Sequence, residues 1–309
     1  MTDYENFSIV TRDELWSLDR RMLVESRLIH GSARQTGQAI DARDDRDEQL
    51  LDLCERECEQ VRDALSPLGE GRARCVVSAR REGGKASVLA TVSLTVLDLA
   101  VVTTLADIRS DHEMLLELAS VRPEAAANDR RLPFVWRNGT AAVLLHEAAG
   151  HPAEHGHAAL QWPTWLRAID DSESGRSDLL AGEAPRAMRR QSFSDVPLPR
   201  MTNVVVGHRS SVLGPLSHPA SRIEILLVAG GRYEPLTETV SLSVSAADLV
   251  DGNESVRLRP FVIRETRAAV ARAMLGASGP VRRYPGVICS REGQELFVGS
   301  YAPDLVTEF

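Results

Sequence analysis

The chain has 309 residues, of which 43% are hydrophobic and 26% are charged, and these proportions are typical of a globular protein. The length is enough for one large or two ordinary domains with a proper hydrophobic core. The formal net charge of −8 at pH 7 argues against nucleic acid or an anionic membrane as a main partner.

The sequence also indicates a compartment. Its first residues lack the basic and apolar stretches of a signal peptide, and no uninterrupted apolar run is long enough to span a bilayer. The chain contains only four cysteines. We therefore expect a protein of the reducing cytoplasm that does not insert into membranes.

Residues 1–70 carry mainly helical patterns, and Asp41 to Ser66 predicts a long amphipathic helix. Cys54 and Cys58 lie four residues apart on its apolar stripe, an arrangement that favours core packing over a metal-binding pair. Cys75 begins a β-rich run and is interpreted as a buried residue in the same way.

Two β-rich runs, near 73–81 and 86–106, predict strands after this helical region. Ser110-Asp111-His112-Glu113 then matches a capping box, in which Ser110 is the N-cap and an acidic residue follows three positions later. This pattern predicts a helix as far as about Ala119, with Met114, Leu115 and Leu118 facing inward.

The most informative stretch of the chain is His146-Glu147-Ala148-Ala149-Gly150-His151, an H-E-x-x-x-H arrangement. It continues an apolar run, Ala141–Leu145, that predicts a buried helix with Thr140 as its N-cap. Two imidazoles that flank a carboxylate are the parts of a zinc hydrolase, because neutral nitrogens hold the metal and the carboxylate handles the proton of the water.

The two histidines are one residue too far apart for a regular helix. Residues five apart point about 140° away from each other, so a regular helix cannot aim both at one ion. Gly150 permits a left-handed or widened turn. Pro152 predicts that the helix ends just after this turn. His151 could then turn back toward His146. The alternative is a chance match, in which one histidine caps the helix and the other packs in the core.

A catalytic zinc site usually has three protein ligands and one open position, so a third ligand is needed. His155 and His157 lie close by in the sequence, but a polar loop beyond the helix end is the favoured interpretation for them. Cys289 is the other candidate, since it closes a predicted strand at a turn, where a thiolate could project into a cleft.

Beyond residue 200 the chain is rich in predicted strands. They cover Asn203–Val206, Arg222–Ala229, Thr237–Val244 and Val256–Ile263. Gly230-Gly231, Asp251-Gly252-Asn253 and Gly286 are expected to form turns, and a helix over Glu265–Leu275 is expected to stop at Gly276. Strands in mostly consecutive hairpins with helices set apart indicate an α+β fold.

Pro123 to Pro133 is interpreted as a linker, which divides the chain into two lobes. We expect an N-terminal lobe over residues 1–130, made of helices with antiparallel strands. A C-terminal, mainly antiparallel β lobe over residues 131–309 would carry the H-E-x-x-x-H helix.

Three separate stretches resemble the TldD/PmbA family of metallopeptidases. The helix resembles that family's H-E-A-V-G-H signature, which also follows an apolar V-L-L run. Pro197-Leu198-Pro199-Arg200-Met201-Thr202-Asn203 is similar to its P-M-P-R-M-T-N stretch. Cys289-Ser290-Arg291-Glu292-Gly293-Gln294, with Val298-Gly299, is similar to its C-G-K-D-G-Q…V-G ending. The three stretches occur in the family's order, and the resemblance extends from about Arg74 to the C-terminus.

The resemblance implies that His146, His151 and Cys289 ligate zinc and that Glu147 is the general base. A coordinated thiol would be held as the thiolate. The resemblance also implies an extended peptide substrate bound in a cleft between two lobes, and a homodimer or a heterodimer with a related subunit. Of the two paired subunits of the family, this chain resembles the metal-bearing one.

We therefore predict a zinc-dependent peptidase that hydrolyses extended or unfolded peptides. Arg200 and Asn203 could orient the substrate backbone or the oxyanion, or they could order the entry to a strand. After His151 the chain departs from the family's G-L-E-G-D sequence, and the stretch to Arg200 is shorter. This departure supports the alternative of a peptide-binding or partner subunit without hydrolytic activity.

Overall fold

The computed structural model describes ten ranges of the chain and three isolated helical residues. The ranges are 5–16, 21–33, 71–82, 85–97, 99–104, 106–127, 132–172, 174–189, 195–208 and 218–309, and the isolated residues are Arg56, Gln60 and Asp63. The chain forms two compact units. The first comprises Met1–Ser120, Arg190–Pro197 and Ile288–Leu296, and the second comprises Val121–Arg189, Leu198–Val287 and Phe297–Phe309.

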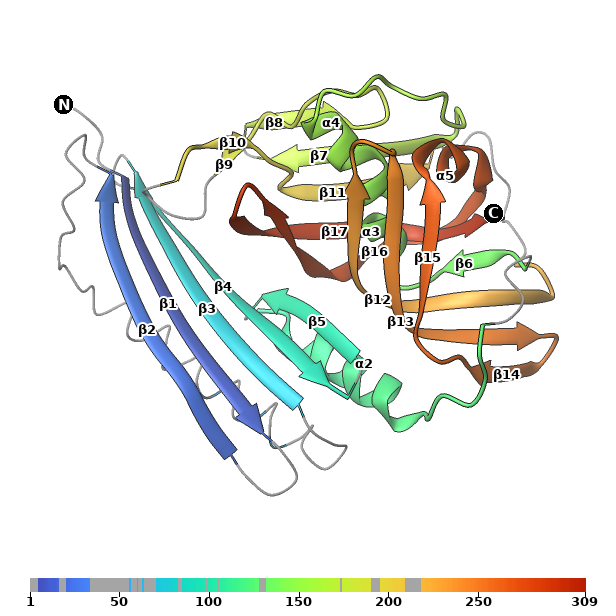
Figure 1. Ribbon diagram of the computed structural model, residues 1–309, viewed down its shortest axis with the longest axis horizontal. Helices are drawn as coiled ribbons and strands as arrows, with labels where there is room; N and C mark the ends of the chain where they lie inside the picture. The colour runs from blue at the N-terminus through green and yellow to red at the C-terminus, as the bar shows by residue number, and fades with distance from the viewer. Residues whose placement is uncertain are drawn as a thin grey trace. The chain divides into compact units, whose positions relative to one another are not determined.

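The first unit contains a five-stranded antiparallel sheet in the order β2-β1-β3-β4-β5, followed by one helix (Figure 1). Its strands are β1 (Glu5–Trp16), β2 (Arg21–Ala33), β3 (Gly71–Glu82), β4 (Lys85–Val96) and β5 (Leu99–Thr104), and the helix is α2 (Ile108–Ser120). The strands predicted near 73–81 and 86–106 are confirmed, the second of them as β4 and β5. A turn at Leu97, with φ of 52°, separates these two strands.

The expectation of a mainly helical region over residues 1–70 is wrong for β1 and β2. β1 pairs with both β2 and β3 along its length, and these long-range hydrogen bonds outweigh the local helix propensity of its Leu, Glu and Arg residues. Arg56, Gln60 and Asp63 are helical, which agrees with a helix in that part of the chain. Cys54 and Cys58 lie outside the described residues.

The helix α2 begins at Ile108, three residues before the first helical position that its capping-box pattern predicts, so Ser110 lies inside the first turn. Leu115 and Leu118 are buried as expected, whereas Met114 is only half-buried. The second residue of the pattern, Asp111, is buried and accepts a hydrogen bond from the hydroxyl of Thr103 on β5. This acidic residue therefore ties α2 to the sheet rather than facing solvent.

A 10-stranded mixed sheet with the main order β14-β13-β12-β6-β17-β11-β7-β8 lies mostly in the second unit. Its strands are β6 (Phe134–Trp136), β7 (Leu166–Ser172), β8 (Gly175–Asp178), β11 (Asn203–His208), β12 (Ser221–Glu234), β13 (Thr239–Asp251), β14 (Glu254–Arg257), β15 (Phe261–Thr266), β16 (Met274–Arg291) and β17 (Gln294–Thr307). The short strands β9 (Met188–Arg189) and β10 (Leu198–Pro199) form a separate pair. Only β11–β17 and β12–β6 are parallel among the pairings of the described strands. The predicted α+β fold is confirmed.

Two predicted turns are instead parts of strands. Gly230-Gly231 lies within β12, which pairs with β13 on both sides of the two glycines, and Gly286 lies within β16. The turn at Gly252 is confirmed, with a φ of 58°. The helix predicted over Glu265–Leu275 is the shorter α5 (Arg267–Ala273), since β16 already begins at Met274.

The predicted metal-binding helix is formed by three consecutive segments, α3 (Ala141–Leu145), η2 (His146–Gly150) and α4 (His151–Glu154). α3 contacts β11 and β12, and η2 contacts β12, β13 and α5. Every residue of α3 is buried, as its apolar sequence predicts. The sheet and α5 therefore enclose the segment that carries both histidines and Glu147.

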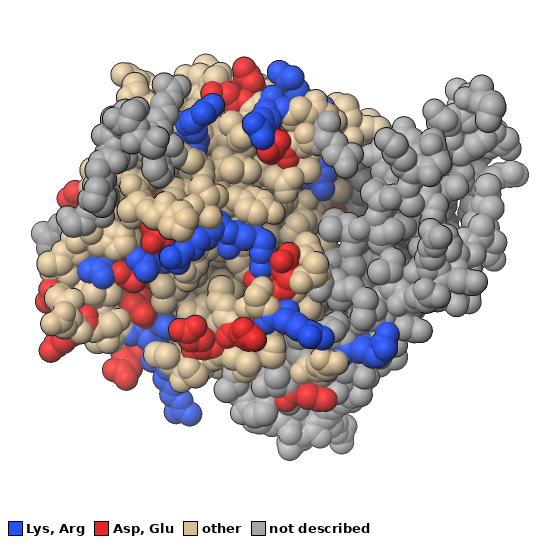
Figure 2. All heavy atoms as spheres, turned by 180° about the vertical axis from the view of Figure 1, so that it is seen from behind, with Lys and Arg blue, Asp and Glu red and all other residues tan. Residues whose placement is uncertain are grey.

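In Figure 2, one face of the molecule carries basic and acidic side chains next to one another, so that face does not present a field of a single sign. None of the helices in the described ranges combines the length and the apolar character that crossing a bilayer requires.

Candidate metal centre

The helix that carries the two histidines starts without the predicted cap. Thr140 already has helical angles, with φ of −56° and ψ of −26°. Its hydroxyl donates a hydrogen bond to the carbonyl oxygen of Arg137, 2.7 Å away, which closes the preceding turn. Thr140 therefore occupies the N-cap position, as predicted, but its side chain makes no capping hydrogen bond.

A widened turn lies between the two histidines. The backbone N–H of His151 donates to the carbonyl oxygen of His146, five residues earlier, which is the hydrogen bond of a π-helix. Gly150 keeps right-handed angles, with φ of −66° and ψ of −59°, and the helix continues through Pro152. The widened turn is confirmed, whereas the predicted end of the helix just after His151 is wrong.

Pro152 explains the position of this turn. In a regular helix the N–H of residue 152 would bond to the carbonyl of Ala148, but proline has no N–H. The guanidinium of Arg267 on α5 takes the place of this N–H, because its Nε donates to the carbonyl of Ala148 at 3.2 Å. Arg267 is only 2% exposed. Its Nη2 donates in addition to the carbonyl of Ala158 at 2.8 Å.

Gly150 has a packing role at this turn. A Cβ atom there would lie 2.0 Å from the sulfur of Met201, a distance that no pair of heavy atoms tolerates without displacement. The absence of a side chain at Gly150 therefore lets the fully buried Met201 pack against the helix.

The widened turn brings both histidines to one side of the helix. The rings of His146 and His151 are nearly perpendicular, with centroids 4.8 Å apart. One ligand atom from each of His146, His151 and Cys289 lies within 4.8 Å of the other two. Cys289, near the end of β16, is 3% exposed, and it is the third ligand that the resemblance implied. The structure thus brings the three predicted ligands together.

Burial favours the neutral form of His146, the first candidate ligand, and this is the form that binds a metal. Desolvation places the pKa of His146 well below its usual value, and the nearby positive charges of His151 and Arg200 act in the same direction. The ring is therefore neutral near pH 7, as a metal ligand must be. Its Nδ1 atom is buried and makes no hydrogen bond with any described residue.

Glu147 lies between the two imidazoles. Its Oε1 is 3.9 Å from Nε2 of His146, and its Oε2 is 3.7 Å from Nε2 of His151. Burial raises the pKa of Glu147 to about 7, against the opposing effect of the His151 charge. Gly231 on β12 touches this side chain so closely that a Cβ atom there would lie 2.5 Å from Cγ of Glu147.

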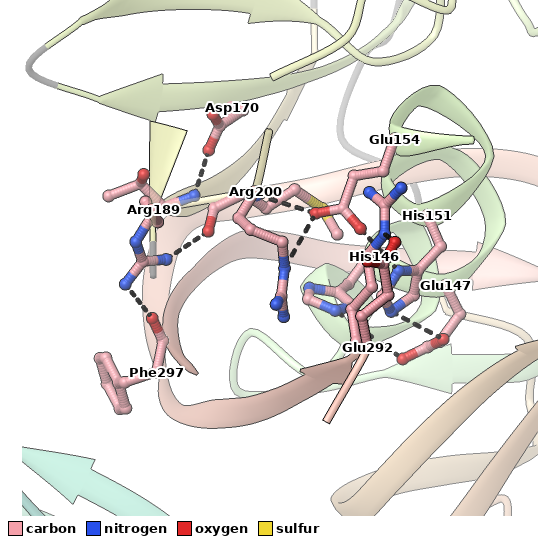
Figure 3. Close-up of polar contacts among 12 residues, drawn as sticks. His146, Glu147, His151, Glu154, Asp170, Arg189, Arg200, Glu292 and Phe297 are labelled. Atoms are coloured by element: carbon pink, nitrogen blue, oxygen red, sulfur yellow. Dashed lines mark hydrogen bonds and ion pairs between the residues drawn. The ribbon is translucent and has the colours of Figure 1, made fainter. Parts of the chain in front are cut away.

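A second carboxylate, Glu154, holds the other side of His151 (Figure 3). Its Oε2 is 3.0 Å from Nδ1 of His151, and its Oε1 accepts the backbone N–H of Met201 at 3.0 Å. The guanidinium of Arg200 is 3.6 Å from the same Oε1. Burial alone would raise the pKa of Glu154, but the bonds to His151 and Met201 and the charge of Arg200 lower it.

The Arg200–Asn203 segment is bound to the protein on several sides. Arg200 is fully buried, and its side chain faces Glu154. Asp170 accepts the backbone N–H groups of Thr202 and Asn203 at 2.6 and 3.1 Å. The amide of Asn203 donates to the carbonyl of Asp171 at 2.9 Å. Both residues proposed to orient substrate thus face the protein, which fits the structural alternative.

The two remaining histidines of the region lie apart from the ligand group. Nδ1 of His157 is 3.1 Å from Oε1 of Glu238 and 2.9 Å from the hydroxyl of Tyr233. His155 is exposed, in the turn after α4. Among the described residues, the only cluster of three or more potential ligands is the one with Cys289. This agrees with the interpretation of His155 and His157 as a polar loop.

The residues fit a zinc ion. Zinc–nitrogen and zinc–sulfur bonds of about 2.0–2.3 Å in a tetrahedron place the ligand atoms about 3.4–3.6 Å apart. The observed limit of 4.8 Å therefore requires the three side chains to close in by about 1 Å. Two neutral imidazoles, one thiolate and a carboxylate on the outer nitrogen of one imidazole form a donor set that zinc prefers.

Three supporting residues were not predicted from the sequence. Glu154 could have been found, because it lies three residues after His151 and therefore on the same helix face. Gly231 and Arg267 come from distant strands and helices, and their sequence surroundings contain no sign of the metal site.

No protein-family model matches this sequence, and no curated protein matches it. Two solved structures are similar over nearly the whole chain. TldE from Thermococcus kodakarensis has a TM-score of 0.55 at 10% identity, covering 100% of this chain and 96% of that chain. A proposed modulator of DNA gyrase from Bacteroides thetaiotaomicron has a TM-score of 0.51 at 10% identity, covering 99% and 94%. The chain therefore has the fold of these proteins, and at this identity the likeness extends to the fold alone.

Proposed function

We propose that the protein is a zinc-dependent peptidase that hydrolyses extended or unfolded peptides, similar to the metal-bearing members of the TldD/PmbA family. One observation carries the proposal: His146, His151 and Cys289 converge to within 4.8 Å, and Glu147 lies beside both imidazoles. The three residues would hold zinc through two neutral nitrogens and one thiolate, which leaves one position open for water or substrate.

When bound, zinc would lower the pKa of its water ligand toward neutrality and polarise the scissile carbonyl. Glu147 would take one proton from the attacking water as the new C–O bond forms. It would then give this proton to the amine nitrogen as the C–N bond breaks, so the same carboxylate takes up the proton and returns it.

The environment of Glu147 suits this role. A general base works best with a pKa near the working pH, and burial brings the pKa of Glu147 to about 7. The positive charge of a bound metal would lower this value and favour the carboxylate. Gly231 lies against the side chain and restricts its position.

For Arg200 and Asn203 we propose a structural role in the site. Arg200 offers a buried positive charge to Glu154, and Asn203 anchors the start of β11 through its bond to Asp171. The Arg-Met-Thr-Asn sequence would then matter because it supports the metal helix. We also propose that the protein acts as a homodimer or as a heterodimer with a related subunit.

The second candidate function is a peptide-binding or partner subunit that does not hydrolyse. Two observations favour it: the short, altered sequence after His151, and the structural similarity to a protein named TldE. It would keep the fold and a structural metal without turnover.

Metal analysis combined with substitution tests the proposal. We expect about one zinc per chain in the wild type and in Glu147→Gln, and much less in His151→Ala and Cys289→Ala. Full zinc content in Cys289→Ala would show that the ligand set is wrong. Cleavage of unfolded peptides should be lost in Glu147→Gln although zinc is bound. A zinc-loaded wild type that cleaves no peptide in a broad screen would favour the partner subunit.

A further inference from the structure

The carboxylate of Glu154 is fully enclosed, and both of its oxygens have defined partners. The side chain is 0% exposed. Oε1 accepts the backbone N–H of Met201 and faces the guanidinium of Arg200, and Oε2 is 3.0 Å from Nδ1 of His151. A carboxylate has no proton to donate, so the hydrogen between Oε2 and His151 belongs to Nδ1.

This assignment fixes the chemistry of the other ring nitrogen. In a neutral imidazole only one nitrogen carries hydrogen, so a proton on Nδ1 places the ring lone pair on Nε2. Nε2 is the atom of His151 that approaches Oε2 of Glu147, at 3.7 Å. The lone pair of His151 therefore lies on the side of the ring where Glu147 lies.

We propose that Glu154 is a positioning residue that sets the tautomer and orientation of His151 for metal binding, and that Arg200 and Met201 hold Glu154 in place. The proposal rests on the proposed metal site and extends it to the Arg-Met-Thr-Asn segment. Carboxylates that bind the outer nitrogen of a metal-ligating histidine typically contribute a factor of 10 to 100 in metal affinity.

The charges of the surrounding groups support this role for Arg200. Without Arg200, a zinc ion would face Glu147, Glu154 and the thiolate of Cys289, which leaves one uncompensated negative charge. Arg200 is fully buried, and with its positive charge the formal charges sum to zero. A buried charge is costly unless it is paired, so Arg200 and Glu154 stabilise one another in this position.

The substitution Glu154→Gln changes the tautomer of His151 but keeps the packing of the side chain at position 154. The amide oxygen can still accept the N–H of Met201, and the side chain has the same shape. The amide NH₂ that replaces Oε2 can only donate, so it would bond to a bare Nδ1 and move the proton of His151 to Nε2. The substitution would thus block the metal-binding lone pair while it keeps the packing.

The matched control is Glu183→Gln. Glu183 also accepts a backbone N–H, that of Asp178 at 2.9 Å, but it is exposed and lies outside the ligand group. Zinc affinity is measured by competition with a chromogenic chelator. We expect Glu154→Gln to weaken zinc binding by a factor of 10 to 100, and Glu183→Gln to leave it unchanged within a factor of two. Equal zinc affinity of Glu154→Gln and the wild type would overturn the proposal.

The tautomer is read directly in the metal-free wild type, so the test does not depend on how the variant folds. Long-range ¹H–¹⁵N spectra of protein with ¹⁵N-labelled histidine distinguish the two ring nitrogens at alkaline pH, and His151→Asn assigns the signals. We expect the proton on Nδ1 of His151, and a proton on Nε2 would contradict the proposal. If the wild type shows the expected tautomer but binds no zinc, the proposed function fails while the Glu154–His151 assignment stands.

Discussion

Arg267 donates a hydrogen bond to the carbonyl of Ala148, the carbonyl that loses its helical partner because residue 152 is proline. The two residues are 119 positions apart in the chain. A buried guanidinium on α5 thus replaces a missing backbone donor in the helix that carries the candidate ligands. This contact between distant elements lies at the widened turn between His146 and His151.

Replacement of Arg267 by methionine should therefore destabilise the protein. The buried carbonyl of Ala148 would lose its donor, as would the carbonyl of the exposed Ala158, at a cost of about 2–4 kcal/mol in the free energy of unfolding. Urea denaturation in the presence of a chelator measures this cost. Arg272→Met, on the exposed side of the same helix, is the control and should change stability by less than about 0.5 kcal/mol. Equal stability of the two variants would contradict the role of Arg267.

The missing N–H of Pro152 leads to a second prediction. Pro152→Ala restores a donor four residues after Ala148, so a regular helical turn becomes available. In the Arg267→Met background this change should recover part of the lost stability. It should also weaken zinc binding, because a regular turn directs His146 and His151 apart. Recovery of both stability and zinc affinity would show that the widened turn does not depend on Pro152.

The candidate metal site was largely predictable from the sequence, because its residues lie in recognisable local patterns. The His146–His151 spacing already required a widened turn, and the resemblance added Cys289. The continuation of the helix through Pro152 was not predictable, since Arg267, whose side chain takes the place of the missing N–H, lies far along the chain. Similarly, Gly230-Gly231 resembles a turn in sequence, but its pairing with β13 makes it part of a strand.

In the N-terminal region, two whole strands, β1 and β2, could not be predicted from their local sequence. The residues of β1 and β2 have no strict alternation of apolar and polar side chains, so their local sequence does not identify strands. Their strand character comes from pairing with β3 and with each other. Tertiary hydrogen bonds of this kind override propensity, whereas α2, with a clear helical period, was predicted to within three residues at its start.

Gly231→Ala should separate metal binding from catalysis. The added Cβ would lie 2.5 Å from Cγ of Glu147 and displace this carboxylate, while no ligand is touched. We expect wild-type zinc content and a loss of peptide cleavage on the order of 100-fold, since small displacements of a catalytic group have effects of this size. Gly230→Ala is the control, because no atom lies within 4 Å of a Cβ there. Full activity of Gly231→Ala would show that Glu147 tolerates displacement.

Gly150→Ala tests the packing between the metal helix and Met201. The new Cβ would meet the sulfur of Met201 at 2.0 Å, and overpacking of this kind costs about 1–3 kcal/mol. Met201→Ala alone should cost about 2–5 kcal/mol because it leaves a cavity. In the double variant the new methyl group occupies part of that cavity, so the two costs should not add. Denaturation of the three variants measures the coupling, and additive costs would contradict the contact.

The raised pKa of Glu147 predicts a pH dependence of the metal-free protein. Its pKa is about 7 in the folded state and 4.5 in the unfolded state, so the folded state binds the proton more tightly. The resulting stabilisation is complete below pH 4.5 and is lost as the pH rises through 7. Glu147→Gln lacks this titration, whereas the opposite effect of His146 is common to both proteins and cancels in their difference. The stability of Glu147→Gln relative to wild type should therefore increase by about 3 kcal/mol between pH 4.5 and pH 8, measured by urea denaturation with a chelator present. A pH-independent difference would show that the carboxyl is not desolvated, and added zinc should reduce the difference, because the metal stabilises the ionised form.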